Sequence, residues 1–440
     1  MVRSAEDQKV SSRYFGTLPL RLSLLLIGFI LMMILRPSSA DAHTKGVSLS
    51  RYGLVDVSWT ANIVYGNFTN YEDGFNPIKL GDRQFKGLSV TSFDLAFSQD
   101  CFILYANFPC KWALFTAFGQ DGAGIEEAFI LFHKLPYYLQ AKTGIFRVNF
   151  MKINQYHDHE WAFADPPLIS TFFLGVDGVH NVGMELNWQP PTPVFMELSA
   201  SLVRGPVGNF DRTFPGKWDT VSGGLSANEF ILFSRATTFF DLTLNSNLEL
   251  GASFASGHNK SNTMDFADPT FNPLGIDAGL GDRTYLYGGD FTYQWKPEPY
   301  SPYVRWTTEY LAGKRQNPVV LSLDRSVRGP GVDLESQVRK RIMGSDTVGG
   351  MYSELAYRFS YYWEVDGRYD YVGIPRGDED RQARYTASLR YYINPVSRIS
   401  LQYSHTDQSG GDKDYDIYYV QFNIGGGTVT PGLGKFYNLF

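Results

Sequence analysis

Residues 383–393 read ARYTASLRYYI, and this stretch decides the fold. The odd positions hold Ala, Tyr, Ala, Leu, Tyr and Ile, and the even positions hold Arg, Thr, Ser, Arg and Tyr. Side chains on a β-strand alternate between two faces with period two. The stretch therefore predicts a strand with one apolar face and one polar face that carries Arg384 and Arg390.

The same alternation recurs from about residue 247 to the C-terminus, in segments of roughly ten residues that are separated by turn residues. The polar faces carry charges in almost every segment, and the apolar faces are rich in aromatic residues, which make up 16% of the chain. Such segments are typical of a transmembrane β-barrel, with lipid outside and water inside. The alternative is a large soluble all-β domain.

Alternation and turn residues together predict an all-β fold, a transmembrane antiparallel β-barrel of about sixteen strands. The expected strands are 47–58, 88–98, 111–119, 125–133, 138–148, 181–189, 194–204, 228–236, 247–257, 284–296, 303–311, 347–358, 361–371, 382–393, 398–406 and 416–424.

The N-terminus has the pattern of a secretory signal peptide, residues 1–42. Arg13 and Arg21 precede the apolar run Leu24–Leu35, and Ala40-Asp41-Ala42 supplies a cleavage site. A membrane anchor is the alternative, although the run is short for a spanning helix. We expect residues 43–440 to form a barrel in the outer membrane of a Gram-negative bacterium, with a C-terminal tail at 425–440.

The connections in the second half alternate between short and long. Residues 190–193, 297–302 and 394–397 are short and contain proline, whereas 258–283 and 312–346 are long. Barrels of this kind place short turns in the periplasm and long loops outside. Seven basic residues in 312–346 suggest a contact with anionic lipopolysaccharide or a solvated loop face; these are Lys314, Arg315, Arg325, Arg328, Arg339, Lys340 and Arg341.

The chain has a formal net charge of −6 and two cysteines. We find no basic arm or RNA-binding motif, so nucleic-acid binding is not supported. We also find no motif for binding a cofactor. In an exported chain the pair Cys101 and Cys110 favours a disulfide over two free thiols. Two cysteines at this spacing without a nearby histidine do not indicate a metal site.

The third long connection, about residues 149–180, concentrates aromatic, histidine and proline side chains. It contains Asn154, His157, His159, Trp161 and Asp165. A purely external loop gains little from such residues, but a loop that folds back into the barrel needs them to pack against the wall. We predict that this loop lies inside the barrel and narrows it.

Residues 88–205 resemble the phosphate-selective porins O and P and their relatives. The resemblance lies in Ile125–Phe129, Gly144-Ile-Phe146, Asn154, His157-x-His159, Trp161-x-Phe163-x-Asp165, Pro167-Leu168, Gly175, Gly178, Gly183 and Glu185–Pro193. It implies a sixteen-stranded barrel, often a homo-trimer, with an inward third loop. In the phosphate-selective members it also implies basic residues along the pore.

The leading hypothesis for function is an outer-membrane porin through which small hydrophilic solutes or ions diffuse, with a possible preference for anions or phosphate. Acidic and basic residues alternate on the inward faces, so a run of unopposed arginines is not evident. The expected pore-lining residues are Lys142, Arg305, Glu309, Glu354, Arg358, Arg368, Arg384 and Arg390.

Two other classes of function are weaker alternatives. His157 and His159, with Asp165, offer ligands for zinc, which suggests metal uptake or binding; hydrogen-bonded braces of the loop are the plainer reading. Ser404, His405 and Asp407 are close in sequence, but adjacent residues on a strand point to opposite faces, so they do not predict a catalytic triad. The chain is therefore not expected to be an enzyme.

Overall fold

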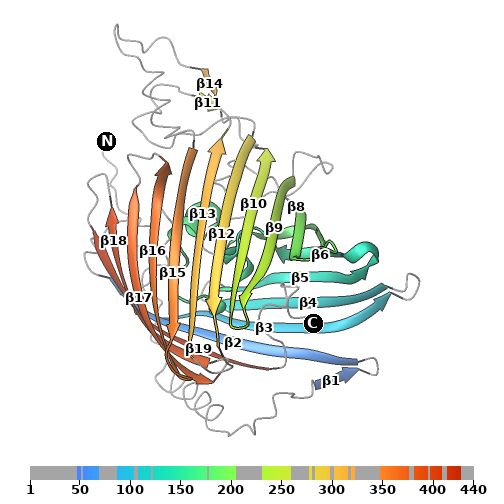
Figure 1. The fold of residues 1–440 in the computed structure, drawn as a ribbon, viewed down its shortest axis with the longest axis horizontal. Coiled ribbons are helices and arrows are strands. Elements are labelled where there is room, and N and C mark those ends of the chain that lie inside the picture. Colours follow the sequence, from blue (N-terminus) through green and yellow to red (C-terminus); the bar gives the residue numbers. More distant parts are fainter. Residues whose placement is uncertain are drawn as a thin grey trace, which may run out of the picture. The chain divides into compact units, whose positions relative to one another are not determined.

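The computed structural model describes residues 47–50, 53–68, 87–103, 108–119, 122–175, 178–204, 230–258, 277–279, 283–297, 302–315, 319–322, 347–375, 381–394, 397–408 and 414–427. These residues form a closed, antiparallel β-barrel of sixteen strands (Figure 1). The expected signal peptide and most of the expected C-terminal tail lie outside the described residues. Among the described residues, no helix is both long and apolar enough to cross a bilayer.

The barrel strands follow one another around the wall in chain order. They are β2 (Gly53–Phe68), β3 (Gly87–Ile103), β4 (Phe108–Gly119), β5 (Gly122–Leu135), β6 (Leu139–Arg147), β7 (His180–Trp188), β8 (Phe195–Arg204), β9 (Phe230–Thr243), β10 (Ser246–His258), β12 (Arg283–Trp295), β13 (Tyr303–Arg315), β15 (Thr347–Arg358), β16 (Trp363–Pro375), β17 (Gln382–Asn394), β18 (Ser397–Gln408) and β19 (Tyr415–Gly427).

The last strand closes the barrel by pairing with the first. β19 runs antiparallel to β2, from the pair Ile417↔Phe68 to the pair Gly427↔Ser58. Closure leaves no free sheet edge, as a barrel in lipid requires. A short strand, β1 (Val47–Ser50), pairs with the start of β2. Two further strands, β11 (Asp277–Gly279) and β14 (Val319–Ser322), pair with each other outside the wall.

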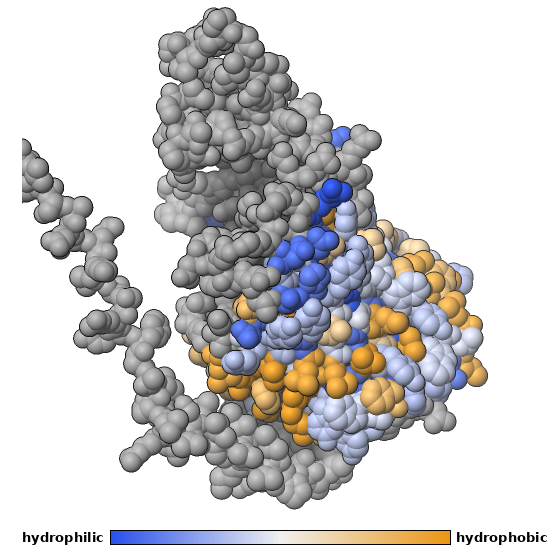
Figure 2. Space-filling view, turned by 90° about the vertical axis from the view of Figure 1, so that its left-hand side faces the viewer, coloured by the Kyte–Doolittle hydropathy of each residue, from blue (hydrophilic) through white to orange (hydrophobic). Residues whose placement is uncertain are grey.

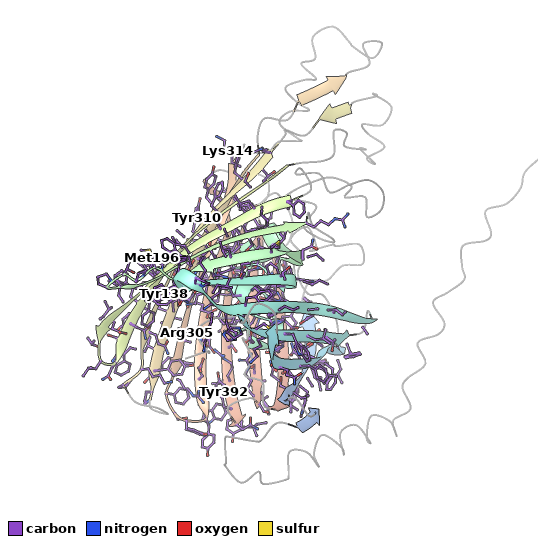
Figure 3. All side chains as sticks on the ribbon, turned by 90° about the vertical axis from the view of Figure 1, so that its right-hand side faces the viewer. Tyr138, Met196, Arg305, Tyr310, Lys314 and Tyr392 are labelled. Carbon is purple, nitrogen blue, oxygen red and sulfur yellow. The ribbon has the colours of Figure 1, made fainter. Side chains whose placement is uncertain are left out.

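The alternation predicted for 383–393 is confirmed. In β17 the inward residues Arg384, Thr386, Ser388 and Arg390 are buried, whereas the outward Tyr385 is 54% exposed. Figure 3 shows that outward side chains such as Met196 and Tyr310 project from the wall, with Lys314 and Tyr392 at opposite ends of the strands. On the face seen in Figure 2 the apolar residues gather in a belt, as expected of a lipid-facing surface.

All sixteen predicted strands overlap strands of the barrel, but several boundaries differ, and β9, for example, ends at Thr243 rather than at 236. The first barrel strand is 53–68 rather than 47–58, and the last strand continues to Gly427 rather than ending at 424. In β2 the side chain of Val64 faces inward and packs with Ala164 and Tyr419. An apolar residue on the inner face breaks the alternation, which is why the pattern missed the second half of this strand.

The two ends of the barrel differ in the length of their connections. One end has short turns, such as residues 136–138 between β5 and β6, and residues 244–245 between β9 and β10. The 3-10 turn η2 (Pro136–Tyr138) makes the first of these. The opposite end carries the connection from β6 to β7, which spans residues 148–179 and folds into the barrel.

Candidate functional site

The loop 148–179, called the inner loop below, lies inside the barrel, and each of its described residues is buried or half-buried. It contains the 3-10 turns η3 (Ile153–Gln155) and η4 (Asp158–Glu160) and the helix α2 (Leu168–Leu174). Asn154 joins its two ends, because its Nδ2 donates to Val148 O (2.9 Å) and its Oδ1 accepts from Val179 N (2.6 Å). The expected inward fold of this loop is confirmed.

Apolar side chains hold one side of the inner loop. Helix α2 packs against β13, β15 and β16, and Met151, Ile169 and Phe173 belong to a buried apolar cluster that also includes Phe233 and Leu286 of the wall.

Glycines in the wall make room for these loop side chains. A Cβ added at Gly288 would lie 2.1 Å from Met151 Sδ, and one added at Gly313 would lie 2.5 Å from Phe173 Cε1. Real Cβ atoms do not approach other atoms so closely, so these glycines are required for close contact with the loop.

The middle of the inner loop is anchored by its two histidines, which lie against the wall formed by β2 to β5. His157 Nε2 lies 2.8 Å from Glu127 Oε1, and its Nδ1 lies 2.9 Å from Glu126 Oε2. His159 Nδ1 lies 3.0 Å from Asp94 Oδ2. The two imidazole rings stack with their centroids 5.6 Å apart.

The carboxylates change the protonation of both rings. Burial, together with Arg147, would lower the pKa of His157, but Glu126 and Glu127 outweigh this and raise it to about 9. Burial would likewise lower the pKa of His159, which Asp158 and Asp94 raise to about 10. Both rings are therefore cationic at neutral pH and pair with the acidic wall.

Asp165 anchors the far part of the inner loop to a different wall. Its Oδ2 lies 2.8 Å from Arg384 Nη1 and 3.3 Å from Arg368 Nη2, and Gln402 Nε2 donates to its Oδ1. Burial would raise the pKa of Asp165, but the two guanidinium groups hold it below the ordinary value. Asp165 thus pairs with arginines, and the expected grouping of His157, His159 and Asp165 around one metal ion is not formed.

Most of the expected pore-lining charges face inward but are covered by partners. Arg390 pairs with Glu364 (2.6 Å) and Asp366, and Lys142 pairs with Glu185 (3.0 Å). Glu309 accepts hydrogen bonds from the backbone N–H groups of Lys152 and Ile153 in the inner loop, both at 2.8 Å. With Arg368 and Arg384, these expected pore-lining residues hold the loop or the wall together, and none of them lines the cavity described next.

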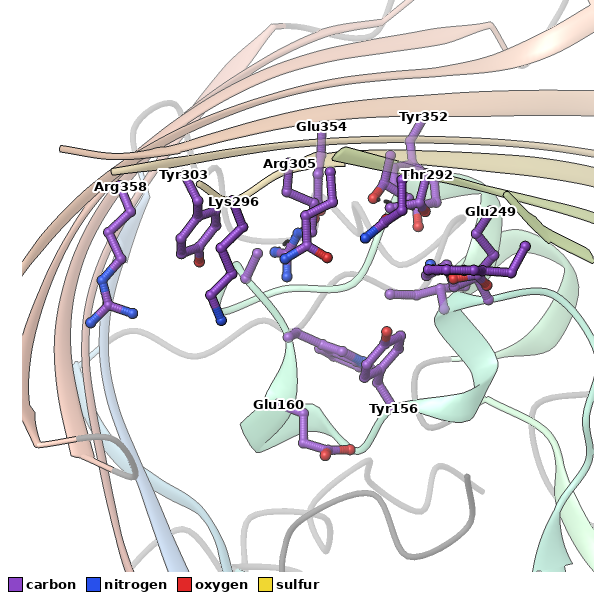
Figure 4. A pocket seen from close by; sticks show the side chains of 18 residues that line it. Tyr156, Glu160, Glu249, Thr292, Lys296, Tyr303, Arg305, Tyr352, Glu354 and Arg358 are labelled. Atoms are coloured by element: carbon purple, nitrogen blue, oxygen red, sulfur yellow. Dashed lines mark hydrogen bonds and ion pairs between the residues drawn. The ribbon is translucent and has the colours of Figure 1, made fainter. Parts of the chain in front are cut away.

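Arg305, Glu354 and Arg358 line a cavity of about 440 Å³ between the inner loop and the wall. Figure 4 shows Lys296, Tyr303, Arg305 and Arg358 on the wall, with Tyr156 and Glu160 of the inner loop across the space. Arg358 donates to Tyr361 O (2.6 Å) and its guanidinium lies 4.1 Å from the centre of the Tyr392 ring. Trp161, also expected in the loop, contributes to the lining.

Several lining residues were not predicted from the sequence: Lys152, Tyr156, Glu160 and Lys296. The sequence offers one signal for the loop's position, because inward positions near the long-loop end of the wall are apolar where a water-filled lumen would require polar residues. Ile231, Phe233, Leu286 and Leu311 are examples, and all are buried beneath the inner loop in its apolar cluster.

Two further expectations concern residues outside the cavity. Cys101 and Cys110 are direct partners in the pairing of β3 with β4, and Cys110 is disulfide-bonded. Ser404 is buried inside the barrel, whereas His405 faces outward, with its Nδ1 2.8 Å from Asp416 Oδ1. The serine and the histidine thus lie on opposite faces of β18 and do not form part of a catalytic triad.

No family model matches the chain. An uncharacterized protein of Aquifex aeolicus (strain VF5) is 28% identical over 351 residues, which cover 75% of this chain. The match spans 66% of that protein, just under two thirds of its length.

Solved structures with a similar fold are outer-membrane barrels. OmpT, an outer membrane protein of Vibrio cholerae, gives a TM-score of 0.52 at 9% identity over 86% of this chain and 99% of that one. The outer membrane channel DcaP of Acinetobacter baumannii gives 0.51 at 10% identity, over 87% and 100%. An anion-selective porin from Comamonas acidovorans gives 0.50 at 8% identity, over 84% and 99%. At such identities the likeness is one of fold, and the fold is that of porin-type β-barrels.

Proposed function

We propose that this chain is an outer-membrane porin whose inner loop narrows the route for small hydrophilic solutes. The observation that carries the proposal is the cavity of about 440 Å³ that the inner loop leaves against the wall, with basic residues on the wall facing Glu160 of the loop. Opposed charges at a narrow point set ion preference in such channels. Solutes cross by passive diffusion, and the chain is not an enzyme.

The charges of the cavity favour a weak preference for anions. Four basic residues line it against three acidic ones. Lys152 pairs with Glu249 at 2.6 Å and Arg305 with Glu354 at 3.4 Å. Lys296 and Arg358 have no ion pair with another described residue, and their charge remains available to a solute.

A strong preference for phosphate does not form part of the proposal. The resemblance to phosphate-selective porins implies a row of basic residues along the pore. Arg368, Arg384 and Arg390 are each ion-paired with a carboxylate and buried. Dehydrating a phosphate ion requires donors that are not already satisfied by carboxylates.

The proposed setting is the outer membrane of a Gram-negative bacterium, with the short turns in the periplasm and the long connections outside. The outward aromatic residues would contact lipid and lipopolysaccharide. A homo-trimer is the proposed assembly, supported by the trimer form of OmpT of Vibrio cholerae, which has a TM-score of 0.51 at 8% identity over 84% of this chain and 99% of that one.

The test is the reversal potential of single channels in a planar bilayer under a salt gradient, repeated with phosphate. We expect weak anion preference in the wild type and a shift toward cations in Arg358→Glu, which reverses a charge in the cavity. Lys314→Glu makes the same change at the other end of the strands, outside the cavity, and serves as the control. A protein without conductance, or an Arg358→Glu channel with unchanged selectivity, would refute the proposal.

A further inference from the structure

A second group of charged residues lies between the inner loop and the wall, and its three side chains are not among those that line the cavity. Asp94 comes from β3, and Asp158 and His159 come from the turn η4 of the inner loop. One ligand atom from each of these residues lies within 4.8 Å of the others. No local pattern connects Asp94 with His159, which lies 65 residues farther along the chain.

The distances within this group suit ligands of one metal ion. His159 Nδ1 lies 3.0 Å from Asp94 Oδ2 and 3.7 Å from Asp158 Oδ1. Ligand atoms bound at about 2.0–2.2 Å to a tetrahedral or octahedral ion are separated by roughly 3–3.6 Å. The three side chains therefore need only small movements to bind the same ion, and His159 Nδ1 releases its proton to the solvent as the ion binds.

Neighbouring side chains hold the carboxylates in position, as partners of metal ligands usually do. Ser92 Oγ donates to Asp94 Oδ2 at 3.1 Å, and Asn62 Nδ2 lies 3.5 Å from Asp158 Oδ2. Asp94 is 8% exposed, yet its Oδ1 has no hydrogen-bond partner among the described residues. A buried carboxylate oxygen without a partner is costly, and a cation would satisfy it.

We propose that Asp94, Asp158 and His159 bind a divalent transition-metal ion that fastens the inner loop to the wall. One imidazole and two carboxylates suit zinc and its neighbours in the first transition row better than magnesium or calcium, which prefer oxygen ligands only. Asp94 belongs to the wall and the other two ligands belong to the loop. The ion thus forms a cross-link at the constriction, with remaining positions open to water.

This site differs from the grouping of His157, His159 and Asp165 that the sequence suggested. Asp165 is bound to Arg368 and Arg384 on another part of the wall, and Asp94 supplies the missing carboxylate. The proposal does not depend on the porin function, since metal binding and channel conductance are measured separately.

The experiment uses the full barrel in detergent, freed of metal with a chelator and then dialysed against Zn²⁺. We expect one ion per chain, a higher melting temperature with the metal, and at least a tenfold loss of affinity in both His159→Gln and Asp94→Asn. Glu249→Gln is the matched control, because it breaks the ion pair between Glu249 of the wall and Lys152 of the inner loop (2.6 Å) and removes no metal ligand. It should bind Zn²⁺ as the wild type does.

Co²⁺ provides a second measurement that requires no variant. An imidazole and carboxylates at a site with few ligands give visible absorption bands distinct from those of hydrated Co²⁺, and one equivalent of Zn²⁺ should remove them. Wild-type protein without stoichiometric uptake of either ion would overturn the proposal. So would folded His159→Gln and Asp94→Asn proteins that bind Zn²⁺ with unchanged affinity.

Discussion

Replacing Asp165 by asparagine should release the inner loop from the wall while the barrel stays folded. The carboxylate is 1% exposed and lies 2.8 Å from Arg384 and 3.3 Å from Arg368. Removing one partner of a buried ion pair typically costs about 3–5 kcal/mol, because the remaining charge stays buried without compensation. The wall strands keep their own hydrogen bonds, so the cost falls on the docked position of the loop.

A loss of about 3 kcal/mol raises the undocked population of the loop relative to the docked one by roughly a hundredfold. We expect Asp165→Asn channels to show larger and noisier single-channel conductance in planar bilayers. Residues 155–165 should also become open to protease in the folded protein.

Asp416→Asn is the matched control for this substitution. It removes a carboxylate on the outward face of β19, where Asp416 accepts a hydrogen bond from Tyr403 and lies against His405. Its conductance should equal that of the wild type. If Asp165→Asn has wild-type conductance and resists protease, the ion pairs with Arg368 and Arg384 do not hold the loop, and the reasoning fails.

Three further outcomes follow from the same contacts. Gly313→Ala places a Cβ against Phe173, and the overpacking should destabilise the protein by about 1–3 kcal/mol and lower its melting temperature. Gly367→Ala is the control: its Cβ would have no atom within 4 Å, so its melting temperature should equal that of the wild type. The pKa of Asp165 is lowered in the folded protein, so its stabilising effect is complete above the ordinary carboxyl pKa and is lost as the pH falls through the lowered value. Conductance should therefore stay constant from neutral pH to about pH 5 and rise only in stronger acid. A rise already at about pH 6 would mean that another group holds the loop. Cys110→Ser removes a disulfide within a short segment and should lower the free energy of unfolding by at most about 3 kcal/mol, with no change in conductance; a changed conductance would show that this end of β3 and β4 affects the route.

The alternation of side chains predicted the barrel because lipid on one face and polar groups on the other leave a strong pattern in each strand. Arg384, Thr386 and Ser388 face inward as that pattern requires. The pattern fails where the inner face is apolar, as at Val64 in β2, because there the neighbour is the inner loop and not water. The alternation of apolar and polar residues along a strand depends on what each face of the strand contacts. The inner loop replaces water on part of the inner face, and there the alternation is lost.

The partners of the inner loop were beyond prediction from a single sequence. Asp165 pairs with Arg384, which is 219 residues away along the chain, and His159 pairs with Asp94, which is 65 residues away. Composition identified the loop as one that packs, since its aromatic and histidine residues need a surface. Whether Asp165 contacts histidines or arginines depends on the path of the loop across the lumen, and that path cannot be predicted from local sequence patterns.

The contacts of the inner loop explain how it keeps one position inside the barrel. Apolar packing holds Met151, Ile169 and Phe173, a carboxylate–arginine cluster holds Asp165, and the acidic wall holds the two histidines. These three anchors lie on different strands. The first depends on apolar packing, and the other two depend on ion pairs with carboxylates, so strong acid weakens the ion pairs and leaves the apolar anchor in place. The cavity is lined by residues of the segment 152–162 of the inner loop. If the cavity is part of the proposed route, its size depends on how firmly the inner loop is held, and we expect substitutions of Lys296 or Arg358 to change selectivity without moving the loop.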